Sequence, residues 1–307
     1  MQSPIGYSAL IDRPPLRWPD RARVALWVQV NLEHFTFDEP GIGLPPTRTN
    51  PPIPDVNNAG WRDYGARVGI WRLMDVLDKH KLRSSTPTNA GVCVHYPEII
   101  REAERRNWEF MGHGITNSRT LSELEEAEER AVIRSSLDAL TSATGTPPKG
   151  WLGPGLAETF ETLDLLAEAG IEYVSDWCND DQPYPIEVRA GRLIGVPYCK
   201  DIGDIPAFVG AGLPAERFCQ MLCDQFDVLY EEGARTGRIF GVAVHPFIAG
   251  QAFRAKWLDR ALEYILGHEQ VWVTTAGEIA DWYYQHYYDE ALAQLRRRAG
   301  RVSAGGE

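Results

Sequence analysis

The stretch Phe110-Met111-Gly112-His113-Gly114-Ile115-Thr116-Asn117-Ser118 is a short apolar run that ends in a histidine between two glycines and then becomes polar. This pattern predicts a buried strand whose C-terminal end opens into a site. Two other β-prone stretches, residues 24–34 and 239–246, also end in polar side chains. Parallel α/β sheets place their active sites at the C-terminal ends of their strands. The sequence therefore predicts one enzyme site that collects Asn31, Glu33, His113, Asn117 and His245.

The rest of the chain alternates between strand-like and helix-like segments with short connections, which favours a single α/β domain over residues 1–307. About seven strand-helix units predict a distorted (β/α) barrel. Strands are expected over residues 24–34, 83–88, 108–114, 150–155, 172–177, 238–246 and 271–275, with a hairpin around Ala190-Gly191. Helices are expected over residues 66–80, from Pro97, over 120–144 with Thr120 or Ser122 as the cap, and over 159–169, 215–233, 253–267 and 276–285.

Three segments fall outside this alternation. Prolines make residues 1–23 an extended lead-in, and residues 38–61 are a long excursion rich in Pro, Gly and Asn. Residues 292–307 are predicted to be a flexible tail or an oligomer contact.

The bulk composition excludes several classes of partner. A formal charge of -12 and a pI near 5.1 argue against binding to nucleic acid or to an anionic membrane. We find no secretion signal and no apolar run long enough to span a bilayer. The five cysteines are scattered and form no CxxC pair, which favours reduced thiols and a cytoplasmic protein.

Several segments in order carry a family resemblance: residues 30–33 (Val-Asn-Leu-Glu), 63–72, 112–114 (Gly-His-Gly), 150–154, 180–184 and 245–272. Together they resemble the polysaccharide deacetylase superfamily, whose members are NodB-homology (β/α) barrels. Within it, the chain is most similar to the branch of cofactor-independent allantoinases and cyclic imide hydrolases. The resemblance spans roughly residues 20–285 and implies a homo-oligomer that acts on a small-molecule substrate.

The resemblance also raises the question of a metal. Metal-dependent members carry an aspartate pair after strand one and a His-x-x-x-His pair after a later strand, whereas this chain has Asn31 with Glu33, and Asn117 four residues after His113. Because Asn is a poor zinc ligand, no cofactor is expected. The alternative is zinc held by Glu33, His113 and a third ligand such as His245 or Asp38. Residues 36–39 (Thr-Phe-Asp-Glu) resemble the first motif of these deacetylases, but they lie beyond the expected end of strand one, so we favour Asn31 and Glu33.

The expected chemistry assigns a role to each central residue. Glu33, with a pKa raised by burial, would act with His113 to position and deprotonate water, and His245 would protonate the departing nitrogen. Asn31 and Asn117 would hydrogen-bond the substrate carbonyl or the developing oxyanion. Further substrate contacts are expected from Trp151, Pro154, Asp180, Asp181, Tyr64 and Arg67, the last from a neighbouring subunit. Asp201 and Asp204, after another strand end, are secondary candidates.

These observations predict a hydrolase of non-peptide C–N bonds that opens a small cyclic amide, such as an imide, a hydantoin or a ureide like allantoin, by metal-independent attack of water. One alternative is a metal-dependent N-deacetylase of polysaccharide or peptidoglycan. The other is a catalytically inactive barrel that binds a ligand.

Overall fold

The computed structural model describes residues 4–39 and 54–304, and its central strand is β1 (Val24–Val30), which is buried along its whole length. Parallel pairing joins β1 to β8 (Arg238–Val244) along one edge. Along the other edge it pairs first with β9 (Val271–Val273) and then, through bridges at Val28 and Leu32, with the segment of β2 (Ser85–Thr88). These bridges join the three-stranded sheet β8-β1-β9 to the six-stranded sheet β2-β3-β4-β5-β7-β6.

The second sheet continues the curve that β1 begins. Its strands are β3 (Glu109–Gly112), β4 (Gly150–Trp151), β5 (Tyr173–Val174), β6 (Tyr184–Ile186) and β7 (Leu193–Gly195). All the pairings are parallel except β6 with β7, which confirms the expected hairpin; its turn contains Gly191 at φ +81°. In the part of the chain that the structure describes, no pairing joins β8 to β6 or β7. The α/β barrel-like fold is confirmed, with more and shorter strands than the seven expected.

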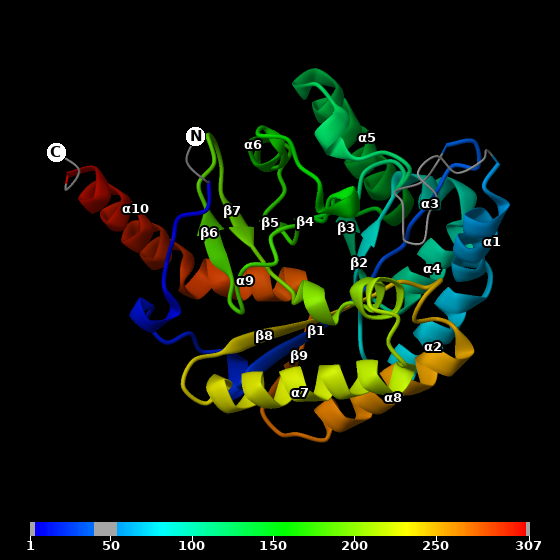
Figure 1. The fold of residues 1–307 in the computed structure, drawn as a ribbon. Helices are drawn as coiled ribbons and strands as arrows, with labels where there is room; N and C mark the ends of the chain where they lie inside the picture. Colours follow the sequence, from blue (N-terminus) through cyan, green and yellow to red (C-terminus); the bar gives the residue numbers. More distant parts are fainter. Residues whose placement is uncertain (1–3, 40–53, 305–307) are drawn as a thin grey trace.

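Helices cover the outside of the curved sheet. Figure 1 shows α7 (Ala215–Gly233) and α8 (Ala252–Leu266) side by side along one side, and the two pack closely. The others are α1 (Val56–Tyr64), α2 (Ile70–Lys79), α3 (Ala90–His95), α4 (Pro97–Arg105), α5 (Glu126–Thr144), α6 (Thr162–Glu168), α9 (Ala276–His286) and α10 (Tyr288–Ala304). Among residues 4–39 and 54–304, no helix has the length and apolar character needed to cross a membrane.

The odd-numbered side chains of β1 position the site. Ala25 and Trp27 pack into a core cluster with Met111 and Tyr173 of neighbouring strands, while the even-numbered side chains pack against the outer helices. Side chains alternate along a strand, so Gln29 and Asn31 continue the row of Ala25 and Trp27 toward the C-terminal end. The row becomes polar where the barrel opens.

Three local predictions are corrected, and one helix was missed. Residues 57–61 belong to helix α1 rather than to an excursion, because Asp55 caps that helix by accepting from the Asn58 N–H; residues 40–53 of the predicted excursion lie outside the described residues. Helix α3 was not predicted. The acidic helix α5 begins at Glu126, since Thr120 and Ser122 lie at a separate 3-10 turn, Leu121–Glu123. Residues 292–304 are helical within α10 rather than frayed.

Candidate active site

A cavity of about 220 Å³ opens at the C-terminal ends of β1, β3 and β8. All five side chains that the sequence places together, those of Asn31, Glu33, His113, Asn117 and His245, line this catalytic cavity. Most of the remaining wall is apolar, with Phe35, Leu152 and Ile205 among the contributors. A few polar groups that converge inside a largely apolar cavity are typical of a small-molecule site.

The carboxylate of Glu33 is the point on which the site converges. Asn117 donates from Nδ2 to Glu33 Oε1 at 2.7 Å. His113 Nε2 and His245 Nε2 lie 3.7 Å and 3.5 Å from the same oxygen. Two imidazoles and one amide, from the ends of β3 and β8, thus face a single carboxylate oxygen that follows β1.

The pKa of Glu33 is lowered, whereas the sequence analysis expected burial to raise it. Burial does favour the neutral acid, but the neighbouring His245 and His113 outweigh it and lower the pKa to about 2. The prediction of a raised pKa was therefore wrong, because it left out the two neighbouring histidines. Glu33 is a carboxylate throughout the neutral range, and it acts chiefly as an anion and a hydrogen-bond acceptor.

His245 is held by a second carboxylate, that of Asp204. Its Nδ1 lies 2.7 Å from Asp204 Oδ1, and its backbone N–H donates to Asp204 Oδ2 at 2.6 Å. Burial opposes a charge on the ring, but Asp204 and Glu33 outweigh burial and raise the pKa of His245 to about 10. His245 is therefore an imidazolium at neutral pH, with Nε2–H directed toward the cavity.

His113 is held by a neutral acceptor instead. Its Nδ1 hydrogen-bonds the backbone carbonyl of Leu152, which can only accept, so the Nδ1 proton is fixed there. In the neutral ring Nε2 then carries a lone pair, and this buried atom has no hydrogen-bond partner among the described residues. The next residue, Gly153, donates its N–H to Asp176 Oδ1 at 2.6 Å, which anchors the loop that holds His113.

The amide side chains form the floor of the site. Asn31 donates from Nδ2 to the Val244 carbonyl at 3.1 Å and accepts from Gln29 Nε2 at 3.0 Å. Asn89, which is fully buried, donates to the His113 carbonyl and, at 3.4 Å, to Asn117 Oδ1. These bonds leave Asn31 and Asn117 one further amide hydrogen each.

The donor set does not fit the zinc site of the metal-dependent deacetylases. Among residues 4–39 and 54–304, no group of three His, Cys, Asp or Glu side chains is arranged to hold a metal ion. In the place of the second histidine, Asn117 turns its Nδ2 donor toward Glu33, where a ligand would turn a lone pair. Asp38, the alternative ligand, is exposed outside the cavity beside Glu39.

Two of the predicted substrate contacts are core residues. Trp151 is 0% exposed and packs in a cluster with Ile133 and Leu166, with its ring against Gly112. Pro154 is buried and packs against Gly114. Neither side chain lines the catalytic cavity, because the short strand β4 turns Trp151 outward toward the helices; the neighbouring Gly153 and Gly155 line the cavity instead.

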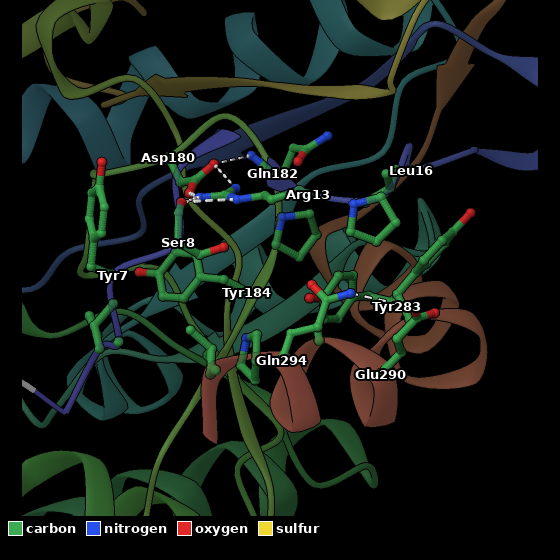
Figure 2. A pocket seen from close by; sticks show the side chains of 18 of the residues that line it. Tyr7, Ser8, Arg13, Leu16, Asp180, Gln182, Tyr184, Tyr283, Glu290 and Gln294 are labelled. Carbon is green, nitrogen blue, oxygen red and sulfur yellow. Dashed lines mark hydrogen bonds and ion pairs between the residues drawn. The ribbon is translucent and has the colours of Figure 1, made fainter. Parts of the chain in front are cut away.

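Asp180 and Asp181 are also away from the catalytic cavity. Figure 2 shows Asp180 in a separate pocket, paired with Arg13 of the N-terminal lead-in; the guanidinium donates to both carboxylate oxygens, at 2.9 Å and 2.6 Å. The backbone carbonyl of Asp181 accepts from Ile239 N–H at 2.8 Å. The sequence placed both at the correct barrel end but could not show that this loop turns outward.

Tyr64 and Arg67 do not reach the cavity within this chain. The Tyr64 hydroxyl accepts from Arg72 at 2.8 Å. Arg67 is paired with Asp63 on the same helical surface, and its side chain is 74% exposed. A contribution of Arg67 to a neighbouring subunit's site stays a prediction.

Several residues of the site were missed or ranked low. Asp204 was a secondary candidate, although it anchors His245, while Asp201 is outside the cavity. Gln29 could have been found, since a polar side chain within an apolar strand and in register with Asn31 signals an interior polar site. Asn89 and the rim residue Lys200 carry no such signal in the sequence.

Comparisons with known proteins agree with this fold. Residues 62–174 match the polysaccharide deacetylase family model. A Schizosaccharomyces pombe protein assigned to the polysaccharide deacetylases is 26% identical over 91% of this chain and 95% of its own. A Pseudomonas aeruginosa crystal structure with the same assignment superposes with a TM-score of 0.84 at 26% identity, covering 91% of this chain and 98% of that one. The PuuE allantoinase structure gives 0.83 at 27%, covering 90% and 96%.

The fold and the paired histidines around one carboxylate define a hydrolytic α/β barrel. The resemblance to the polysaccharide deacetylase superfamily that the sequence predicted is confirmed, by the family model over residues 62–174 and by the likeness of the fold over nine-tenths of the chain. The enzyme class that these comparisons support is a hydrolase acting on C–N bonds other than peptide bonds.

Proposed function

We propose that this protein opens the ring of a small cyclic amide, such as an imide, a hydantoin or a ureide like allantoin, by attack of water without a metal. The observation that carries the proposal is the convergence on Glu33 Oε1 of His113, whose Nδ1 bonds a backbone carbonyl, and of the imidazolium of His245. This arrangement supplies a base and an acid on either side of one anion, which is what hydrolysis of an amide requires. The likeness to PuuE allantoinase supports a cyclic ureide as the substrate class.

In the proposed mechanism, a water molecule binds between Glu33 and His113 Nε2. As its oxygen attacks the ring carbonyl carbon, one proton passes to His113 Nε2, and Glu33 stabilises the imidazolium that forms. The free amide hydrogens of Asn31 and Asn117 hydrogen-bond the oxyanion. His245 then donates its Nε2 proton to the ring nitrogen as the C–N bond breaks, so that water adds hydroxyl to carbon and hydrogen to nitrogen.

The size of the cavity supports a small substrate. A volume of about 220 Å³ is below the range of roughly 300–1,000 Å³ typical of drug-sized ligand pockets, and thus suits a single small ring rather than several sugar rings. Two carbonyls of an imide or ureide ring also suit two amide donors.

The test is hydrolysis of a panel containing succinimide, glutarimide, dihydrouracil, hydantoin, allantoin and an N-acetylglucosamine oligomer, each with and without a strong chelator. We expect chelator-resistant opening of at least one ring. Activity on the acetylated sugar alone, lost with chelator and restored by zinc, would show a metal-dependent deacetylase instead. If binding is measurable but no substrate turns over, the protein is an inactive ligand-binding barrel.

A further inference from the structure

A second cavity lies where the N-terminal lead-in, β6, α9 and α10 meet. This part of the molecule is on the side away from helices α1, α2, α3 and α4 (Figure 1). We call it the aromatic pocket, because Tyr7, Trp177, Tyr184, Tyr283 and Tyr287 contribute to its wall. Its volume is about 310 Å³, and none of its lining residues lines the catalytic cavity. It is therefore a separate site, and its function is independent of the function proposed above.

The charges inside the aromatic pocket cancel. Arg13 and Asp180 form a two-bond ion pair, and Arg13 also donates to the Ser8 carbonyl while Asp180 accepts from Gln182 N–H. Figure 2 shows this network on one side of the pocket, with Glu290 and Gln294 of α10 on the other. Glu290 is exposed at the rim. Because burial of an unpaired ion is unfavourable, the interior favours a neutral ligand.

One hydroxyl in the wall has no acceptor for its proton. Tyr184 is 7% exposed, and its oxygen has the Asn179 side chain nearby as a donor, but no acceptor lies within hydrogen-bond distance among the described residues. Burial and the nearby Asp180 raise the pKa of this phenol, so the hydroxyl keeps its proton and is a donor at every physiological pH. A buried donor without an acceptor is unfavourable in the empty pocket, and a ligand atom that accepts its hydrogen would remove that cost.

The flat rings of Tyr184 and Tyr283 add apolar faces to this donor, and Tyr283 is 4% exposed. Aromatic faces bind the face of another ring, while the amides of Asn179 and Gln294 can reach polar groups at a ring's edge. We propose that the aromatic pocket binds a small neutral ring compound with hydrogen-bonding groups at its edge, and that the Tyr184 hydroxyl donates to it. A monosaccharide and a cyclic amide share this chemistry.

The experiment is calorimetric titration of the full chain with N-acetylglucosamine in one arm and hydantoin in the other. We expect saturable binding of at least one probe with a Kd near or below about 1 mM. Tyr184→Phe removes only the hydroxyl and should weaken that binding by about 3- to 10-fold. Tyr264→Phe, at an exposed tyrosine on α8, is the matched control and should change nothing.

A second variant locates the binding. Ala291 of α10 lines the aromatic pocket, and Ala291→Phe should fill it and abolish binding, while the KM for any ring substrate of the catalytic cavity stays the same. Binding that survives Ala291→Phe in a folded protein and is unchanged in Tyr184→Phe would overturn the proposal, and so would the absence of saturable binding of both probes. Loss of ring hydrolysis in Glu33→Gln with probe binding intact would separate this site from the catalytic one.

Discussion

The ends of β3 and β8 each bring one histidine to the same oxygen of Glu33, but the two rings are held by different partners. His113 hydrogen-bonds the uncharged Leu152 carbonyl, whereas His245 is bound by the carboxylate of Asp204. A carbonyl fixes a tautomer without adding charge, while a carboxylate stabilises the protonated ring. In the proposed mechanism, this difference in the partner of Nδ1 makes His113 at the β3 end the base and His245 at the β8 end the acid.

Removal of the anion that both histidines face should have the largest effect. Glu33→Gln keeps the shape and the hydrogen bond from Asn117 but removes the charge that both imidazolium forms require. We expect kcat/KM for ring opening to fall by about 10²- to 10⁴-fold in steady-state assays. Glu39→Gln, in the exposed segment that resembles the deacetylase motif, is the control and should be fully active. Near-normal turnover by Glu33→Gln would mean that the carboxylate has no part in the chemistry.

The raised pKa of His245 predicts where activity should fall on the alkaline side of the pH profile. Because the reactive form needs His245 protonated, activity should fall as pH rises through about 10. Asp204→Asn removes the carboxylate that raises the pKa of His245, so the alkaline limb should move to lower pH. We also expect kcat to fall by about 10- to 100-fold, since a hydrogen bond to a charged group is lost. A limb that stays in place would show that His245 is not the titrating acid.

His113 at the β3 end is held in place by a chain of hydrogen bonds. Asp176 holds Gly153, and the adjoining Leu152 carbonyl holds His113. Asp176→Ala should let the carbonyl move and lower kcat by about 10-fold, in line with other outer-shell substitutions. In contrast to Asp204→Asn, it should leave the alkaline limb unchanged. A shifted limb with Asp176→Ala would contradict the division of roles between the two strand ends.

The sequence predicted the site residues that directly follow buried strands. It did not predict the side chains whose direction is set by a loop or by the length of a strand. Asn31, Glu33, His113, Asn117 and His245 follow buried strands in register, so parallel pairing alone brings them together. Asp180 and Trp151 occupy similar positions in the sequence, but a turn of the following loop and the shortness of β4 direct them elsewhere. The pKa of Glu33 was mispredicted for a related reason. The direction of its pKa shift depends on two histidines, and the sequence does not give their distances from Glu33.

The smallest expected effect on activity is at Trp151, which tests whether the β4 end takes part in the site at all. Trp151→Phe removes part of a fully buried ring that packs on Gly112, immediately before His113. The cavity left in the core should lower the free energy of unfolding by about 1–3 kcal/mol, measured by denaturant titration. Since no atom of Trp151 lines the catalytic cavity, the KM should change by less than about twofold. If the KM rises strongly while stability is unchanged, Trp151 contacts substrate, and the packing of β3 on β4 differs in solution.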